Sequence, residues 1–522
     1  MESLDQVADS WSRIHRVAFR FAFIYLVLYN LPFPLGTLPH TVRAAQTYES
    51  LWDRVVPWVG NHLLSLHHEI VISNNCSGDT TYDYVRVLCS LGLACVGSLV
   101  WSLLHRSHSE YERLHQWLRT YIRLSVGAAL IMYGADKIFL VHFPPPNLYK
   151  LLEPLGNYSR MSLLWTFTGA SRNYTVFAGS LQLLGGVLLF VPRLTTLGAL
   201  IDIAVFSNIL ALNFGYDLPV KLYTLHVLIL CFFLVLPDGQ RLLRLFVLNQ
   251  SIASSPESRL FKSPRWNTLA TVAQLMLGGV LVCLLLSRAH DYEKRTFGAE
   301  SKSPLYGIWT VDEFMVDGRV LPPLSTDDTR WKLVVFQFPN QVGIQSMNDS
   351  WVRYWLREDT AKNTVAIGSL HESNPAFEFV FSKPDSRLLT LTGRDIRVKL
   401  HRLDETQFAI LDRGFHWIDE DTALVMDEER VCDRVRRPGQ EFSLWRQVRT
   451  NGLANERIPK GPNESVNIEM NQRQRIPQDR VRNGNAEPIA THTYRSEKQA
   501  DEQQRQYQKP GVRTDGRKKP LA

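Results

Sequence analysis

The sequence has few of the residues that form common redox centres. Its 522 residues include six cysteines. The segment 117–249 contains no Cys-x-x-Cys pair, no pair of histidines placed to ligate a haem and no nucleotide-binding loop. These absences exclude the usual dithiol, haem and nucleotide centres from this segment.

Disulfide and metal chemistry also have little support. Cys76 and Cys432 lie outside the apolar stretches and could pair, but their distance in sequence leaves the pairing open. Adjacent residues on a helix point in different directions, so His67, His68 and Glu69 do not predict a metal site. Four cysteines within apolar stretches are expected to pack as small apolar side chains: Cys89, Cys95, Cys231 and Cys283.

Apolar stretches that could cross a bilayer are missing after residue 290 but fill the residues before it. A crossing takes about 20 apolar residues for about 30 Å of hydrocarbon. We predict a multi-pass α-helical membrane domain at 1–289, followed by a soluble half. Its seven predicted spans are 17–33, 84–104, 119–139, 174–190, 194–214, 220–236 and 268–286.

A signal peptide is the alternative interpretation of the first span, because this apolar run follows a basic start of the chain. It is longer than a usual signal-peptide core, is flanked by Pro32 and Pro34, and has no small-x-small cleavage site nearby. We therefore predict a retained helix, although it carries Arg20.

Basic residues in the loops predict the orientation, since short cytoplasmic loops are enriched in Lys and Arg. An inside N-terminus and seven spans place everything after Ser287 outside, whereas six spans would reverse this. The net charge of +7 comes partly from these loops and does not indicate nucleic acid. Predicted inner residues are Arg13, Arg16, Arg106, Arg113, Arg193, Arg241, Arg244, Arg259, Lys262 and Arg265, against Arg43, Arg54, Lys150, Arg160 and Arg172 outside.

Two outer loops are predicted to form amphipathic helices. In 47–70, apolar residues such as Leu51, Trp52, Val55 and Val59 recur at helical spacing. Such a helix would lie on the outer leaflet or pack over the bundle. The segment 148–164 shows a similar pattern after three prolines.

Ionisable groups within the predicted spans are the main functional candidates, because each is costly in hydrocarbon unless it faces a partner or a cavity. Asp202 lies mid-span and should face the interior, with Arg123, Lys221 or His226 as its ionic partner. It either pins neighbouring helices or takes part in a redox or proton site. Glycines of the spans are expected to permit close packing. The candidate set is Arg123, Asp136, Lys137, Asp202, Asn208, Lys221 and His226.

A family resemblance covers residues 117–249. Its motifs are Tyr133-Gly134-Ala135-Asp136-Lys137, Phe143-Pro144, 164–169 (LWTFTG), Gly185-Gly186 and 212–222 (LNFGYDLPVKL). With these motifs the segment resembles DoxX-like membrane proteins. The resemblance implies a four-helix membrane bundle and a link to quinone-coupled oxidation or a membrane oxidoreductase complex. An electron carrier would then be a bound quinone or a cofactor of a partner protein.

Short alternating runs follow a linker at 290–303 and predict a β-barrel at 304–426. Turn sequences such as Asp317-Gly318 separate the runs, as in an up-and-down antiparallel barrel. The predicted strands are 307–316, 332–338, 341–347, 352–357, 364–370, 377–382, 388–392, 396–402 and 407–418.

The first strand contains Gly307-Ile308-Trp309, which resembles the Gly-x-Trp of lipocalins. In such barrels a basic residue of the last strand covers this tryptophan. The resemblance implies that Arg413, or as second choice Arg402, covers Trp309. The barrel could enclose a small apolar ligand or fill its lumen with side chains.

The tail at 427–522 is polar and predicted to be largely disordered. Two functions remain. In the first, the chain is a quinone-linked oxidoreductase subunit of the bacterial inner membrane, and its outer barrel binds a ligand or a redox partner protein. In the second, it catalyses no reaction, and the membrane domain anchors a lipocalin-like binding or sensing barrel. We favour the first; the substrate and electron acceptor stay open.

Overall fold

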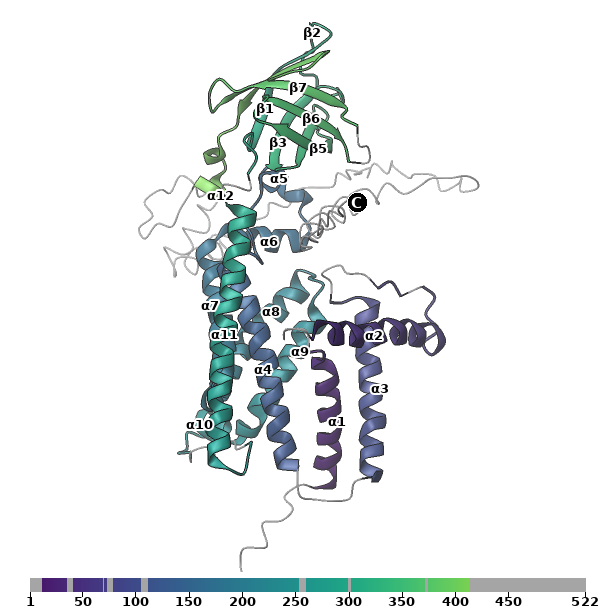
Figure 1. The fold of residues 1–522 in the computed structure, drawn as a ribbon, viewed down its shortest axis with the longest axis vertical. Coiled ribbons are helices and arrows are strands. Elements are labelled where there is room, and N and C mark those ends of the chain that lie inside the picture. The colour runs from purple at the N-terminus through teal and green to yellow at the C-terminus, as the bar shows by residue number, and fades with distance from the viewer. Residues whose placement is uncertain are drawn as a thin grey trace, which may run out of the picture. The chain divides into compact units, whose positions relative to one another are not determined.

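The computed structural model describes residues 12–34, 41–68, 70–72, 78–104, 111–252, 260–298, 302–370 and 374–412. Helices occupy the N-terminal region, and a β-barrel follows residue 306 (Figure 1). The predicted order of a helical region and then a barrel is thus confirmed. The tail, Cys76 and Cys432 lie outside the described residues.

Five helices of the described chain are long and apolar enough to cross a membrane. They are α3 (Thr81–Leu104), α7 (Arg172–Phe190), α8 (Thr195–Gly215), α9 (Lys221–Val235) with α10 (Gly239–Phe246), and α11 (Pro264–Phe297). Two more predicted spans form the helices α1 (Arg13–Asn30) and α4 (Tyr111–Ile138), which carry more charge. These helices agree with the prediction of a membrane protein.

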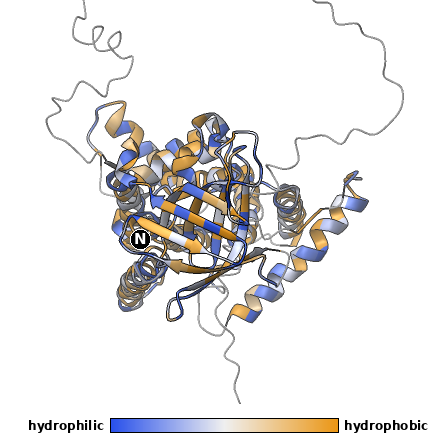
Figure 2. Cartoon of the chain, turned by 90° about the horizontal axis from the view of Figure 1, so that it is seen from above, coloured by the Kyte–Doolittle hydropathy of each residue, from blue (hydrophilic) through white to orange (hydrophobic). Residues whose placement is uncertain are grey.

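The amphipathic helix predicted at 47–70 is α2 (Val42–His62). It lies across α1 and α3 (Figure 1) and buries Trp52 and Val56 in a cluster with Val85. On its other side Leu51 and Trp58 are exposed. Figure 2 shows the mixture of hydrophilic and hydrophobic residues along the helices and strands.

The second predicted amphipathic helix, at 148–164, is wrong as one element. It is divided into α5 (Leu148–Leu152), a 3-10 turn η1 (Leu155–Asn157) and α6 (Arg160–Ala170). Pro154 lies in the break, since proline cannot continue a helix. Asn147 and Ser159 cap the starts of α5 and α6 through their side chains.

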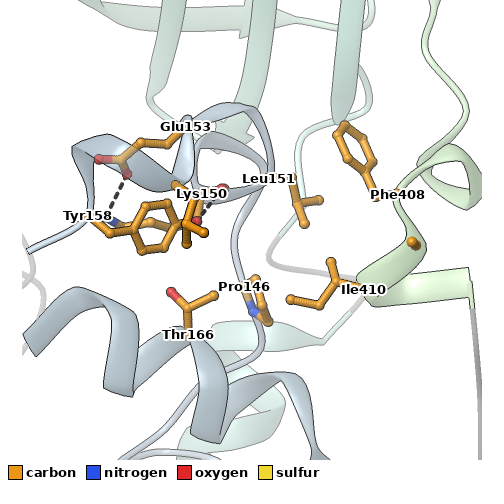
Figure 3. Close-up of a pocket in the computed structure, with 10 residues that line it drawn as sticks. Pro146, Lys150, Leu151, Glu153, Tyr158, Thr166, Phe408 and Ile410 are labelled. Atoms are coloured by element: carbon orange, nitrogen blue, oxygen red, sulfur yellow. Dashed lines mark hydrogen bonds and ion pairs between the residues drawn. The ribbon is translucent and has the colours of Figure 1, made fainter. Parts of the chain in front are cut away.

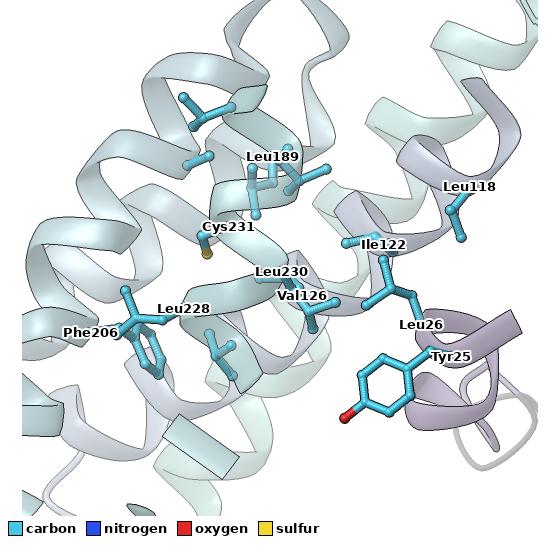
Figure 4. Close-up of a cluster of buried hydrophobic side chains, with 14 of the residues drawn as sticks. Tyr25, Leu26, Leu118, Ile122, Val126, Leu189, Phe206, Leu228, Leu230 and Cys231 are labelled. Carbon is cyan, nitrogen blue, oxygen red and sulfur yellow. The ribbon is translucent and has the colours of Figure 1, made fainter. Parts of the chain in front are cut away.

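Four helices, α4, α7, α8 and α9, pack in sequence order, and α9 also contacts α4. Leu189, Phe206, Leu230 and Cys231 belong to their apolar core (Figure 4). Glycines line the contacts of α7, as predicted: a Cβ on Gly134 would lie 2.7 Å from the Leu183 backbone nitrogen. The packing prediction fails at Gly279, where no neighbour lies within 4 Å.

The predicted linker at 290–303 is helical in its first half. Helix α11 continues beyond its apolar part to Phe297. Ala289 is buried, and Glu293 lies 3.8 Å from Arg172 of α7. The residues of this extension, such as Lys294 and Arg295, favour helix, so the loss of apolar character did not mark its end.

Eight antiparallel strands close into a barrel, with β1 paired to both β3 and β9. Period-2 alternation predicted all eight within about two residues; the hairpin strand β2 was missed. The strands are β1 (Gly307–Val316), β2 (Arg319–Val320), β3 (Trp331–Phe338), β4 (Gln341–Ser346), β5 (Trp351–Asp359), β6 (Thr364–Ser369), β7 (Phe377–Ser382), β8 (Leu388–Thr392) and β9 (Ile396–Arg402).

The predicted ninth strand at 407–418 is wrong over its described part. A 3-10 turn, η5 (Glu405–Gln407), and a short helix, α12 (Ala409–Asp412), follow β9. Asp404 caps the turn by accepting a hydrogen bond from the Thr406 backbone. Since β9 already pairs with β1, the barrel has no open edge for another strand there.

Side chains of the barrel fill its interior. Trp331 lies 5.5 Å from Phe314, 5.7 Å from Phe377 and 6.0 Å from Phe379 between ring centroids. Phe314, Trp331 and Phe379 belong to one core cluster, against which Phe377 packs and to which each strand from β3 to β9 contributes. The sequence left open whether the barrel encloses a small ligand or is filled by its own side chains. The structure has the filled form.

Trp309 is fully buried, as predicted, and its indole N–H donates to the Leu305 carbonyl at 2.8 Å. The cation over its ring is Lys383, with Nζ 5.9 Å from the ring centroid. Arg402 instead lies against Gly307 and pairs with Glu405 at 3.1 Å. Arg413, the first choice, lies outside the described residues. The covering cation, Lys383, lies in the turn that follows β7. The period-2 pattern assigns strand residues to a face of the sheet, but it does not apply to residues of a turn.

We expect a fragment of residues 302–412 to unfold cooperatively, and Trp309→Ala to lower its free energy of unfolding by about 3–5 kcal/mol, as in other large-to-small core changes. Urea denaturation followed by circular dichroism measures this. Trp351→Ala is the control, because Trp351 is 38% exposed; it should cost less than about 1 kcal/mol. Equal losses in the two variants, or a fragment without a cooperative transition, would contradict the expectation.

Candidate functional site

The seven predicted site residues do not form one cluster. Asn208 is exposed on the outside of α8. Lys221 lies at the start of α9, where it binds Asp217 at 2.8 Å and lies 3.8 Å from Asp79. Asp136 is half-buried and lies within the electrostatic influence of Arg288. The other four candidates face the helix interior at separate places.

Asp202 is fully buried between α7 and α8, which confirms that it faces the interior. Its carboxyl group lies against Gly185, where a Cβ would clash with it. Within the described residues, neither carboxyl oxygen has a hydrogen-bond partner. The predicted ionic partners were therefore wrong. In the folded chain each of them is engaged by other groups.

Arg123 of α4 ties three helices together. Its guanidinium donates to Thr195 at 3.2 Å, at the start of α8, and to Gln274 of α11. These partners are neutral, and the Nε atom of Arg123 has no partner among the described residues. This cation is thus solvated by neutral oxygens.

Lys137 of α4 and Asp202 of α8 contact α7 about one helical turn apart. Its Nζ donates to Gln182 at 2.8 Å and lies 5.8 Å from the ring centroid of Phe143. Gln182 and Gly185 are three residues apart on α7, so their side-chain positions are neighbours. Helix α7 therefore brings a buried amine from α4 and a buried acid from α8 to adjacent turns, where protons and carbonyl oxygens could both be bound.

His226 belongs to a second polar group, formed with α1. Its Nδ1 lies 2.7 Å from the Leu222 carbonyl, which requires a proton on Nδ1. Its Nε2 lies 2.6 Å from the Tyr25 hydroxyl, and in the neutral tautomer it accepts a hydrogen bond from that group. Tyr29 stacks on the imidazole at 4.0 Å between centroids.

A third group of aromatic residues lies near the end of α4. Tyr133 lies 5.9 Å from Tyr223 and 6.0 Å from His142, which lies 6.0 Å from Trp165. Burial, and next the charge of Lys137, lower the pKa of His142 to about 3. His142 is therefore neutral at physiological pH. Sequence analysis did not identify the aromatic residues of the second and third groups as site candidates. The available signal was the spacing of Tyr25 and Tyr29, which lie one turn apart on α1.

A cavity of about 190 Å³ lies between the α5–α6 segment and Phe408–Ile410 (Figure 3). Its polar side chains are engaged with one another: Lys150 binds Glu153 and Ser162, each at 2.7 Å, and Tyr158 donates to the Lys150 carbonyl at 2.6 Å. Across the described ranges, His, Cys, Asp and Glu form no group of three suited to a metal ion. The Lys137 and Asp202 region is the stronger candidate.

No protein-family model and no solved structure matches the chain. A segment of 124 residues is 32% identical to YwoB of Bacillus subtilis (strain 168), whose description is "uncharacterized protein". The segment covers 24% of this chain and 79% of YwoB. Through these residues, the chain belongs to the same protein family as YwoB.

Proposed function

We propose that this chain is a DoxX-like protein of the bacterial inner membrane and the quinone-handling subunit of an oxidoreductase. The observation that carries the proposal is Asp202, fully buried with neither oxygen hydrogen-bonded in the described chain. A carboxyl group inside a membrane domain is costly unless it serves a site. The neutral, protonated acid is the less costly form there, because burial penalises the charged form much more than the neutral one.

The packing of α4, α7, α8 and α9 supports the DoxX-like assignment. Most residues of these helices lie within the segment 117–249, and each helix contacts the next. The contact of α9 with α4 closes the set. A closed set of four helices is the arrangement that the resemblance implies.

The side chains around α7 suit a quinone. When bound, a quinone supplies two-electron chemistry that is coupled to proton uptake. Lys137 has three N–H donors, of which Gln182 takes one, so the amine can hold a carbonyl oxygen. Asp202 can hold or release a proton one turn away. Gly185 leaves the space that its carboxyl group occupies.

We also propose that α1 and α4 cross the membrane, which makes seven spans. A buried arginine of each helix is hydrogen-bonded within the helical region: Arg20 donates to Ser102 at 2.6 Å and to Tyr111, and Arg123 donates to Thr195 and Gln274. With an inside N-terminus, seven spans place the barrel and tail outside.

The barrel is assigned to docking in this proposal. Its interior is occupied by its own aromatic and aliphatic side chains. That observation weighs against the second function, a barrel that carries an apolar ligand in its lumen. A redox partner protein would then bind the outer surface.

A quinone should co-purify with the protein in mild detergent, and Lys137→Met should lower its occupancy about tenfold or more, because a hydrogen bond to a charged donor is lost. Mass spectrometry of the extracted lipids measures the amount of quinone per protein. Asn208→Leu is the control, since Asn208 is exposed on α8. A wild type without quinone, or equal occupancy in both variants, would count against the proposal.

Asp202→Asn should leave the fold intact, because the amide has the shape of the neutral acid. We expect the midpoint of thermal unfolding to stay within about 3 °C of the wild type. Infrared spectroscopy should show the carbonyl stretch of a protonated carboxyl group in the wild type and its loss in the variant. If the band persists in the variant, or if the variant fails to fold, Asp202 is not a proton-carrying acid.

Orientation can be tested with single cysteines in a cysteine-free background. An impermeant maleimide on intact cells should label Asn348→Cys, in the exposed β4–β5 turn, and should label Ser107→Cys only after permeabilisation. The reason is the excess of basic residues in the predicted inner loops. Labelling of Ser107→Cys but not Asn348→Cys would reverse the topology.

A further inference from the structure

The outer face of β5 carries two tryptophans and two arginines in alternation: Trp351, Arg353, Trp355 and Arg357, called here the Trp–Arg strip. Successive strand residues point to opposite faces. Leu356 points into the barrel core, so the strip points outward. Trp351 is 38% exposed, and Arg357 is also exposed.

Glycines on the flanking strands let aromatic rings lie flat on this surface. The Trp355 ring covers Gly368 of β6, and the Tyr149 ring of α5 covers Gly343 of β4. Arg357 lies 5.5 Å from the Trp355 ring centroid. The strip is therefore a built surface of stacked aromatic and guanidinium planes.

The strip continues from the contact between the barrel and α5. Arg353 lies 5.4 Å from the Tyr149 ring centroid, and Trp351 packs edge-on to the same ring at 5.7 Å. Leu148 of α5 packs on Ile308 and Val335. Nine residues separate α5 from the end of α4, so this contact lies close to the ends of the helices.

A second link holds the same strand. The Ser303 hydroxyl donates to Glu358 of β5 at 2.5 Å. Six residues after Phe297, the end of α11, Ser303 can lie at most about 20 Å from that end. Glu358 directly follows Arg357, so the Arg357 end of the strip is held near the end of α11, a helix that we assign to the membrane.

The charge of the strip is uncompensated in the described chain. Arg353 and Arg357 form no ion pair with a described carboxylate. Asp359, on the same face, lies 3.6 Å from Lys362. Glu378 lies on β7, two strands away from the strip, where it is opposite Ala366 of β6. Two guanidinium groups thus remain for a partner of negative charge.

We propose that the Trp–Arg strip binds anionic phospholipid headgroups at the membrane surface beside the helical domain. Tryptophan rings favour the headgroup region, and guanidinium groups bind phosphate through paired hydrogen bonds. The strip holds the barrel down on the bilayer. The proposal uses the membrane assignment of the helices but not the quinone site or the side on which the barrel lies.

The test uses the full chain, free of native cysteines, with a fluorophore on Ala361→Cys in the exposed β5–β6 turn. Nanodiscs of phosphatidylcholine, with or without phosphatidylglycerol, carry a headgroup nitroxide quencher. We expect stronger quenching with phosphatidylglycerol. The double variant R353Q/R357Q should shift the ratio of docked to undocked barrel by roughly thirtyfold, from the contribution of two basic residues near an anionic surface.

The matched control is R394Q/R397Q, which removes two exposed arginines. They lie near the C-terminal end of β1, where Arg397 pairs with Met315. This control should leave quenching unchanged, and R353K/R357K should retain most of it. Equal quenching in the two lipid compositions, or in R353Q/R357Q and the wild type, overturns the proposal. So does an equal loss in the control. An unquenched wild type also overturns it and leaves the strip to a protein partner. Cysteine labelling and quinone extraction report on the proposed function separately.

Discussion

The close approach of α7 to α4 and α8 is the constraint on which the helical region depends. Helices in hydrocarbon gain little by hiding apolar surface, so they are held by tight packing and by satisfied polar groups. A Cβ on Gly179 would lie 2.8 Å from the Gly134 carbonyl oxygen, and one on Gly198 would lie 3.0 Å from that of Gly185. This backbone proximity brings Lys137 within reach of Gln182 and encloses Asp202.

The buried polar groups divide into two kinds. Asp238 shows the structural kind: it accepts from Thr196 at 2.5 Å and pairs with Arg241 at 2.7 Å and Arg119 at 3.3 Å. Such a carboxylate links helices and is compensated by its partners. Asp202 has no such partners in the described chain. The difference in compensation, and not burial alone, distinguishes the candidate site from the framework.

The barrel combines a closed, filled interior with a specialised outer surface. Closure of β1 on β9 removes the free strand edges that would pair with other chains. Its outer surface carries the contacts with α5, because Gly343 leaves room for the Tyr149 ring. Burial raises the pKa of Tyr149 to about 12, so its hydroxyl stays neutral at this contact. The barrel is thus attached through a side-chain contact as well as through its linker.

Periodicity and composition in the sequence determined the class of each element: apolar runs predicted the helices, and alternation predicted eight barrel strands, because these patterns reflect which face each residue must bury. The cost of a charge at mid-span predicted that Asp202 faces the interior, and the resemblance to the lipocalin Gly-x-Trp predicted that Trp309 is buried. None of these arguments identified the neighbours of the two residues. Lys383 over Trp309, and Gly185 beside Asp202, come from distant or irregular segments. Only tertiary packing decided these contacts, since local sequence patterns say which face is buried but not which side chains meet across it.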